Sequence, residues 1–275
     1  MKNILIPIDF SPCSKGAARM GVFLARKARA KIHLLHIANI PVGWDKKPLQ
    51  IRQQNPAIES RLKAAEKKIR KFSTHKMFKG LTLTTAINGD AAFEQILAYA
   101  KFHHIQLIVM GAHGAGESAG LFIGSTAQRV MRMASCPVLS VKKNYTPTAI
   151  RKIIFASDFD ETITRPVNMV KNLAASLKAS IDLVYINTPN HFKNSEEVLR
   201  QMNAEVHVQK QVQFNCIIYN DHDKEAGVMN YAKKSKAGMI AMVTNLRKRK
   251  AGYLLGVTET VLFHTDVPVL SFVQK

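Results

Sequence analysis

The amino-acid sequence contains two copies of one pattern, and this repeat limits what the chain can fold into. Residues 2–10 match residues 152–159, and the matches continue at residues 33–37 with 182–186, 99–101 with 231–233, and 137–140 with 268–271. A repeating unit of about 140 residues is too long for a solenoid repeat and has the size of a domain. The chain of 275 residues is therefore expected to hold two domains of one kind, residues 1–143 and 150–275, joined by a linker.

Strands and helices alternate within the first copy. Apolar stretches predict five strands, at residues 2–8, 31–37, 81–87, 106–110 and 138–141. Between them, apolar residues recur at helical spacing, and Ser11-Pro12 and Pro56 have the residue types that begin helices. Residues 39–55 are expected to form a long loop. The alternation predicts an α/β fold, in which helices cover both faces of a parallel sheet.

A glycine-rich segment follows the fourth predicted strand. Gly111, Gly114 and Gly124 precede Ser125 and Thr126, which open the next helix. Glycines let an anion approach the backbone, and the first N–H groups of a helix have no partner within the helix. A strand, a glycine-rich loop and a helix start in this order predict a phosphate-binding site. The alternative is an ordinary long loop in which Ser125 is the N-cap of the helix.

The second copy differs from the first in this segment. When Gly256 is aligned with Gly124, Val243 replaces Gly111, Leu246 replaces Gly114, and Val257 replaces Ser125. The second loop also carries four consecutive cations at residues 247–250, which are interpreted as a solvated loop. If the first copy holds phosphate through its backbone, the second copy cannot do so in the same way.

Charge and composition limit which ligands and which cellular compartment are expected. Residues 1–143 carry 23 of the 40 Lys and Arg but only 7 of the 19 Asp and Glu. The resulting positive electrostatic field attracts anions. Many of the cations, however, are interpreted as the solvated faces of helices, and aromatic residues are sparse. Nucleic acid is therefore not the expected partner. No apolar run is long enough to span a membrane. Three widely spaced cysteines and the absence of a signal-peptide pattern favour a reduced cytoplasm.

Histidines and cysteines do not predict a metal or catalytic site. His33 and His36 fall on opposite faces of a strand, and His103-His104 is interpreted as the end of a helix. Cys13 follows a helix start and could have a lowered pKa, but an inert, partly packed thiol is favoured. Within the glycine loop, His113 is interpreted as a surface residue, and Glu117 alone makes a poor case for a catalytic base.

Several motifs together resemble one known family. The start of the chain (residues 4–11), the spacing Gly111-x2-Gly114-x9-Gly124-Ser125, and the following Cys136-Pro137-Val138 resemble the universal stress protein family, in its tandem two-domain form. The resemblance implies a doubly wound, five-stranded parallel sheet of order 3-2-1-4-5 in each domain. It also implies ATP binding, usually with a divalent metal such as Mg, and a nucleotide-responsive regulatory role in the stress response.

The resemblance also implies which residues would contact ATP. In the strand order 3-2-1-4-5, the direction of winding reverses between strands 1 and 4, and ligands bind outside the carboxyl ends of strands at such a point. Asp9 has a second interpretation, as a cap or turn carboxylate ahead of the first helix. The implied contacts are Pro7, Asp9 and the backbone of Ile37 for adenine and ribose, and Gly111, Gly114, Gly124, Ser125 and Thr126 for the phosphates.

The family likeness further implies that the two domains pair within the chain as a pseudo-dimer. The last strands, from Val138 to Lys142 and from Val269 to Val273, are expected to run antiparallel to each other, and a homodimer and an unknown protein partner remain open. Two other functions remain open as well. One is an interaction module without nucleotide, and the other is a slow ATPase, which the lack of a Walker lysine and of paired carboxylates disfavours.

Overall fold

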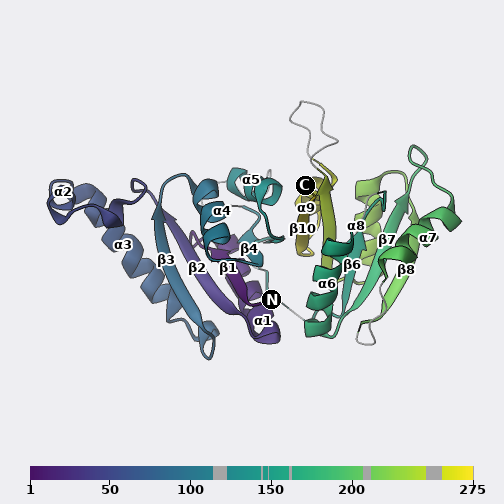
Figure 1. Ribbon diagram of the computed structural model, residues 1–275, viewed down its shortest axis with the longest axis horizontal. Helices are drawn as coiled ribbons and strands as arrows, with labels where there is room; N and C mark the ends of the chain where they lie inside the picture. The colour runs from purple at the N-terminus through teal and green to yellow at the C-terminus, as the bar shows by residue number, and fades with distance from the viewer. Residues whose placement is uncertain are drawn as a thin grey trace. The chain divides into compact units, whose positions relative to one another are not determined.

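The computed structural model describes residues 1–113, 123–143, 145–147, 149–160, 163–206, 212–245 and 256–274 (Figure 1). These residues form two compact units. The first comprises Met1–Val138 and Lys142–Thr146, and the second comprises Leu139–Val141 and Pro147–Lys275. Gly114, Glu117 and residues 246–250, which the sequence singled out, lie outside the described residues.

The first half of the chain has the strand order β3-β2-β1-β4-β5, as the family resemblance implies. The pairs β1–β2, β1–β4 and β2–β3 are parallel, with Ile4 beside both Ile32 and Leu107. The strands are β1 (Asn3–Pro7), β2 (Lys31–Ala38), β3 (Leu83–Gly89), β4 (Leu107–Gly111) and β5 (Val138–Val141). The helices are α1 (Pro12–Ala28), α2 (Leu49–Gln53), α3 (Pro56–Ser73), α4 (Ala92–Phe102) and α5 (Ser125–Met133).

Helix α1 begins and packs as its sequence dictates. Ser11 is the N-cap, and its Oγ accepts the N–H of Ser14 at 3.2 Å, while Pro12 occupies the first helical position. The helix lies close against the sheet, because a Cβ on Gly21 would come within 2.4 Å of the Ile6 side chain. A glycine at position 21 is therefore what permits α1 to approach β1.

The expectation of a long loop over residues 39–55 is wrong. This segment contains a 3₁₀ turn, Trp44–Lys46, and the short helix α2. Trp44 is 5% exposed and packs in a cluster with Leu62 and Ala65 of α3. Arg52 of α2 pairs with Glu59 of α3 at 2.7 Å. Such tertiary contacts order a segment too short to be recognised by helical periodicity.

The second half has the strand order β10-β9-β6-β7-β8. Its four strand pairs are all parallel. The strands are β6 (Lys152–Ala156), β7 (Ser180–Asn187), β8 (Phe214–Asn220), β9 (Met239–Asn245) and β10 (Val269–Gln274). The helices are α6 (Thr164–Leu177), α7 (Ser195–Glu205), α8 (Lys224–Lys234) and α9 (Val257–His264). Among the described residues, no helix has the length and apolar character needed to cross a membrane.

Each unit buries a polar cluster around an equivalent tyrosine. In the second unit, Asp182 of β7 is 1% exposed. Its Oδ2 lies 2.7 Å from Lys152 Nζ and 2.9 Å from Tyr231 Oη, and its Oδ1 lies 2.6 Å from Asn215 Nδ2. Burial alone would raise the pKa of Asp182, but these hydrogen bonds outweigh burial and lower the pKa.

In the first unit, His33 takes the place of the aspartate. His33 is 4% exposed, and its Nδ1 lies 3.2 Å from Tyr99 Oη. Burial, together with the positive charges of Lys31 and His103, lowers the pKa of His33 from 6.5 to about 4. The histidine is therefore neutral in the folded unit at physiological pH.

The first unit is expected to lose stability as the pH falls from about 6.5 toward 4. In this range the unfolded chain binds a proton at His33 and the folded unit does not, so acid favours unfolding, by about 2 kcal/mol at pH 5. Urea unfolding at pH 7 and pH 5, followed by the fluorescence of Trp44, the one tryptophan of the chain, measures this loss. Between pH 7 and pH 5, the variant His33→Gln should lose less unfolding free energy than the wild type. An equal loss in both proteins would contradict the prediction.

Candidate functional site

The first unit contains a cavity of about 440 Å³ at the carboxyl ends of its strands. Pro7 lies at the end of β1, Ile37 near the end of β2 and Gly111 at the end of β4. The sequence-predicted residues that line this cavity are Pro7, Asp9, Ile37, Gly111, Gly124, Ser125 and Thr126. Gly114 is the one predicted site residue that lies outside the described residues. The cavity occupies the place between β1 and β4 where the winding of the sheet reverses.

Helix α5 begins at this cavity, with a glycine as its N-cap residue. Its N-cap is Gly124, so the alternative in which Ser125 caps the helix is wrong; Ser125 is the first helical residue. Gly124 provides no side-chain cap hydrogen bond, and the first turn of α5 contains no acidic residue. The N–H of Gly124 donates to the Ala112 carbonyl at 2.9 Å. A helix start of this kind presents backbone N–H groups and a partial positive charge to an anion.

Gly111 has a packing role besides any role in binding. A Cβ at this position would lie 2.7 Å from Cys13 Cβ and 3.0 Å from the backbone nitrogen of Ser14. Real Cβ atoms essentially never come as close to another heavy atom as 2.7 Å. The end of β4 and the start of α1 can therefore meet only if residue 111 is a glycine.

Asp9 forms the turn that leads into α1, and the structure thus supports its interpretation as a turn carboxylate. Its Oδ1 accepts the N–H of Ser11 at 3.0 Å. Phe10, between them, has a φ of 65°, in the left-handed region. His36 supports the same turn, because its Nδ1 donates to the carbonyl of Ile8 at 2.7 Å. Asp9 also lines the cavity, so the turn fixes the position of a cavity carboxylate.

Cys13, in the first turn of α1, is buried. Burial raises the pKa of this thiol, and the backbone N–H of His113 only partly counteracts this effect. The thiol is therefore mostly protonated at neutral pH and is not an activated nucleophile. His113 itself lines the cavity and is partly buried, whereas the sequence placed it on the surface.

The second unit has a cavity of about 350 Å³ in the equivalent place. Ala156, Asp158, Ile186, Val243, Gly256 and Val257 line it, and they align with Pro7, Asp9, Ile37, Gly111, Gly124 and Ser125 of the first unit. Val243 and Val257 bring side chains where the first unit has a glycine and a small hydroxyl. The two units thus have a cavity in the same place, but the side chains that line it differ.

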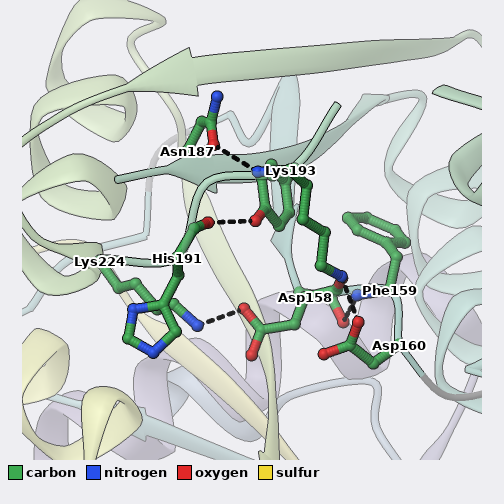
Figure 2. A network of polar contacts seen from close by, with 9 residues as sticks. Asp158, Phe159, Asp160, Asn187, His191, Lys193 and Lys224 are labelled. Carbon is green, nitrogen blue, oxygen red and sulfur yellow. Dashed lines mark hydrogen bonds and ion pairs between the residues drawn. The ribbon is translucent and has the colours of Figure 1, made fainter. Parts of the chain in front are cut away.

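Two lysines bind the acidic groups at this second cavity (Figure 2). Lys224, the first residue of α8, pairs with Asp158 at 2.8 Å. Lys193 donates to the backbone carbonyl of Asp158 at 3.0 Å and pairs with Asp160. On the aligned sequences, Lys224 takes the position of Ala92. The equivalent of Asp9 is therefore held by a lysine that the first unit lacks.

Contacts of its own segment hold Lys193 in place (Figure 2). The backbone N–H of Lys193 donates to Asn187 Oδ1 at 3.2 Å, and the Tyr185 hydroxyl donates to the His191 carbonyl at 2.8 Å. The Lys193 ammonium lies 5.4 Å from the centroid of the Tyr185 ring. Sequence reasoning missed both lysines.

The second cavity also contains a buried carboxylate, Glu259. This residue is 1% exposed and occupies the third position of α9. Its Oε2 accepts the N–H of Gly256, the N-cap residue, at 2.8 Å. The start of α9 is thus capped by an acidic side chain of its own first turn, whereas the first turn of α5 contains no acidic residue. Among the described residues of both units, no group of three or more His, Cys, Asp or Glu side chains could hold a metal ion.

Comparison with known proteins identifies the family. The model of the universal stress protein family matches residues 1–142. Universal stress protein YxiE of Bacillus subtilis is 30% identical over 146 residues, which are 51% of this chain and 98% of that protein. Universal stress protein MJ0531 of Methanocaldococcus jannaschii is 27% identical over 150 residues, which are 52% of this chain and 82% of that protein.

A solved structure of another protein has a similar fold over nearly the whole length of this chain. The crystal structure of a universal stress protein from Archaeoglobus fulgidus superimposes with a TM-score of 0.77 and covers 98% of this chain and 97% of its own. At 17% identity this likeness concerns the fold alone. Because the family model covers half of the chain, and the fold and strand order are those of the family, the chain belongs to the universal stress protein family.

Proposed function

We propose that the first unit binds ATP and that the protein is a nucleotide-responsive regulator. The observation that supports this function best is the start of α5, where Gly124, Ser125 and Thr126 line the cavity of about 440 Å³ and the N-cap residue has no side chain. Free N–H groups at a helix start bind phosphate groups, and the helix dipole adds to the attraction. The strong positive charge of residues 1–143 favours the approach of an anionic ligand.

The cavity offers two parts of different chemistry, which fit the two parts of a nucleotide. Ser125 and Thr126 carry the hydroxyl groups and N–H groups of the α5 start, and Gly124 leaves room beside them. Pro7 and Ile37 form an apolar wall on the side of β1 and β2. In this proposal the phosphates contact the α5 start, while adenine and ribose lie near Pro7, Ile37 and Asp9.

The proposal is one of binding and regulation. A divalent metal such as Mg²⁺ would be held by the phosphates of ATP and would neutralise part of their charge. Asp9 is the one carboxylate among the described residues of the cavity, and its Oδ1 already accepts the N–H of Ser11. A carboxylate engaged in a turn is poorly suited to serve as a general base.

A calorimetric titration of the full-length protein with ATP and Mg²⁺ tests this function. Mass spectrometry should first show whether nucleotide has been co-purified. We expect about one ATP per chain, because the two cavities differ at the helix start that would contact phosphate. If a protein free of nucleotide binds no ATP, the proposal fails, and the function as an interaction module without nucleotide takes its place.

A further inference from the structure

Helix α3 of the first unit carries a row of exposed lysines. Lys63, Lys67 and Lys71 follow one another at a spacing of four residues, and all three are exposed. Residues four apart lie on the same face of a helix. A surface hollow of about 390 Å³ is lined by these lysines together with Glu66, Arg70 and Thr74. The four cations of this hollow, Lys63, Lys67, Arg70 and Lys71, form what we call the basic face of α3.

The basic face is not a requirement of the fold. Lysines four residues apart on a helix repel each other and weaken the helix slightly. Helix α3 contains six basic and two acidic residues, whereas α7, which follows the equivalent strand of the second unit, contains one basic and three acidic residues. The same architecture therefore forms with the opposite charge on this helix. The charge of α3 points to a partner that is negatively charged.

Apolar side chains lie beside the basic face. Helix α2 is at one end of the first unit, beyond α3 (Figure 1). Its Leu49 is 65% exposed and its Ile51 is 42% exposed. Arg52 of α2 pairs with Glu59 of α3 at 2.7 Å; this hydrogen bond lowers the pKa of Glu59, and the nearby charge of Lys63 adds to the effect. The exposed apolar residues of α2 thus adjoin the start of the basic face.

This combination of side chains fits a lipid surface better than a nucleic acid. A membrane with anionic lipids offers headgroup phosphates to cations and, just below them, an apolar region to aliphatic side chains. A nucleic acid would use the cations but leave Leu49 and Ile51 in water. Aromatic rings on which bases could stack are not presented here, because Trp44 is 5% exposed and Phe72 packs against Phe78 with 5.6 Å between the ring centroids.

We propose that α2 and the basic face of α3 bind the first unit to membranes that carry anionic lipids. Leu49 and Ile51 enter the boundary between headgroups and acyl chains, and the basic face contacts the headgroup phosphates. Such binding is peripheral and reversible, because two aliphatic side chains and a few cations hold a protein far less firmly than a spanning helix does. None of these residues lines the cavity of the first unit, so the inference goes beyond the proposed function and does not depend on ATP binding.

Sedimentation of the full-length protein with lipid vesicles tests the proposal. One set of vesicles contains phosphatidylglycerol and phosphatidylcholine in equal parts, the other contains phosphatidylcholine alone, and no nucleotide is added. The wild type should sediment with the anionic vesicles and stay in solution with the neutral ones. Added salt should weaken the binding, because the cations and the headgroups are exposed to solvent.

Charge reversal on α3 is the first arm of the test. The triple variant Lys63→Glu, Lys67→Glu, Lys71→Glu should bind the anionic vesicles about a hundredfold more weakly than the wild type. The matched control reverses three exposed lysines of the second unit, Lys178, Lys233 and Lys236, and thus changes the net charge by the same amount. This control should bind nearly as the wild type does. Circular dichroism checks that both variants fold.

Removing the apolar side chains of α2 is the second arm. The double variant Leu49→Ser, Ile51→Ser should bind the anionic vesicles about tenfold more weakly, and salt should release it more easily than the wild type. Phe192→Ser is the matched control, because Phe192 is 74% exposed in the second unit. This control should not change the binding.

Any of four results would overturn the proposal. The first three are a wild type that does not sediment with anionic vesicles, equal losses in the two folded lysine variants, and unchanged binding in the folded double variant of α2. The fourth is a wild type that binds a DNA duplex through the lysines of α3 and binds no vesicles, which would make nucleic acid the partner of the basic face.

Discussion

Replacing Gly124 by valine is expected to abolish ATP binding while the first unit stays folded. Gly124 has φ −57° and ψ 136°, a conformation that any residue adopts. The valine side chain would stand at the start of α5, where a phosphate group is proposed to approach. We expect the affinity to fall by about a hundredfold or more, or about 3 kcal/mol. Calorimetry with ATP and a thermal melt of the same sample measure both outcomes.

Gly256→Val is the matched control for this prediction. Gly256 is the N-cap of α9, with φ −77° and ψ 166°, so valine is again compatible with the backbone. Because the second cavity is not expected to bind nucleotide, the ATP affinity should not change. A large loss in Gly256→Val would place the nucleotide in the second unit, and tight binding by Gly124→Val would refute the assignment of the α5 start.

The second large effect is expected from Asp182→Ala, which should destabilise the second unit by about 3 kcal/mol. The substitution removes the acceptor for Lys152, Tyr231 and Asn215 and leaves a cavity in the core. The stabilisation by Asp182 is present at neutral pH, because its pKa is lowered in the folded unit, and it is lost as the pH falls through that lowered pKa.

Hydrogen exchange of the β7 and β8 amides measures this destabilisation, since it reports on the second unit alone. The fluorescence transition of Trp44, which belongs to the first unit, provides the internal control. Asp221→Ala is the matched variant, because the Asp221 carboxylate bonds to Asn230 at 2.8 Å in a more exposed place. Comparable protection in Asp182→Ala and Asp221→Ala would show that the buried cluster contributes little.

Strands and helix starts could be predicted because they depend on local signals, whereas the strand order was implied by the family resemblance. Ser11-Pro12 caps α1 as expected, and β5 has the expected bounds, Val138–Val141. The helix α2 could not be predicted, since its order comes from Trp44 and from the Arg52–Glu59 pair, which connect separate segments. Contacts between separate segments cannot be inferred from the local residue pattern.

The candidate site could be predicted only in part for a similar reason. Glycines and a helix start identify a phosphate site by their spacing, and seven of the eight predicted residues line one cavity. The binding roles of these residues remain predictions. Glu259, Lys224 and Lys193 could not be predicted from the positions that align with the glycine motif, because none of the three aligns with a residue of that motif. Aligning Ala127 with Glu259 and Ala92 with Lys224 would have found two of them.

The close contact between Gly111 and Cys13 has a consequence for how the two copies diverged. In the second copy the equivalent of Gly111 is Val243, and helix α6 begins at Thr164, which aligns with Lys15 and not with Pro12. The second unit therefore differs from the first both in this side chain and in where the helix begins. We expect that Val243→Gly alone would not give α6 the close contact that α1 makes with β4.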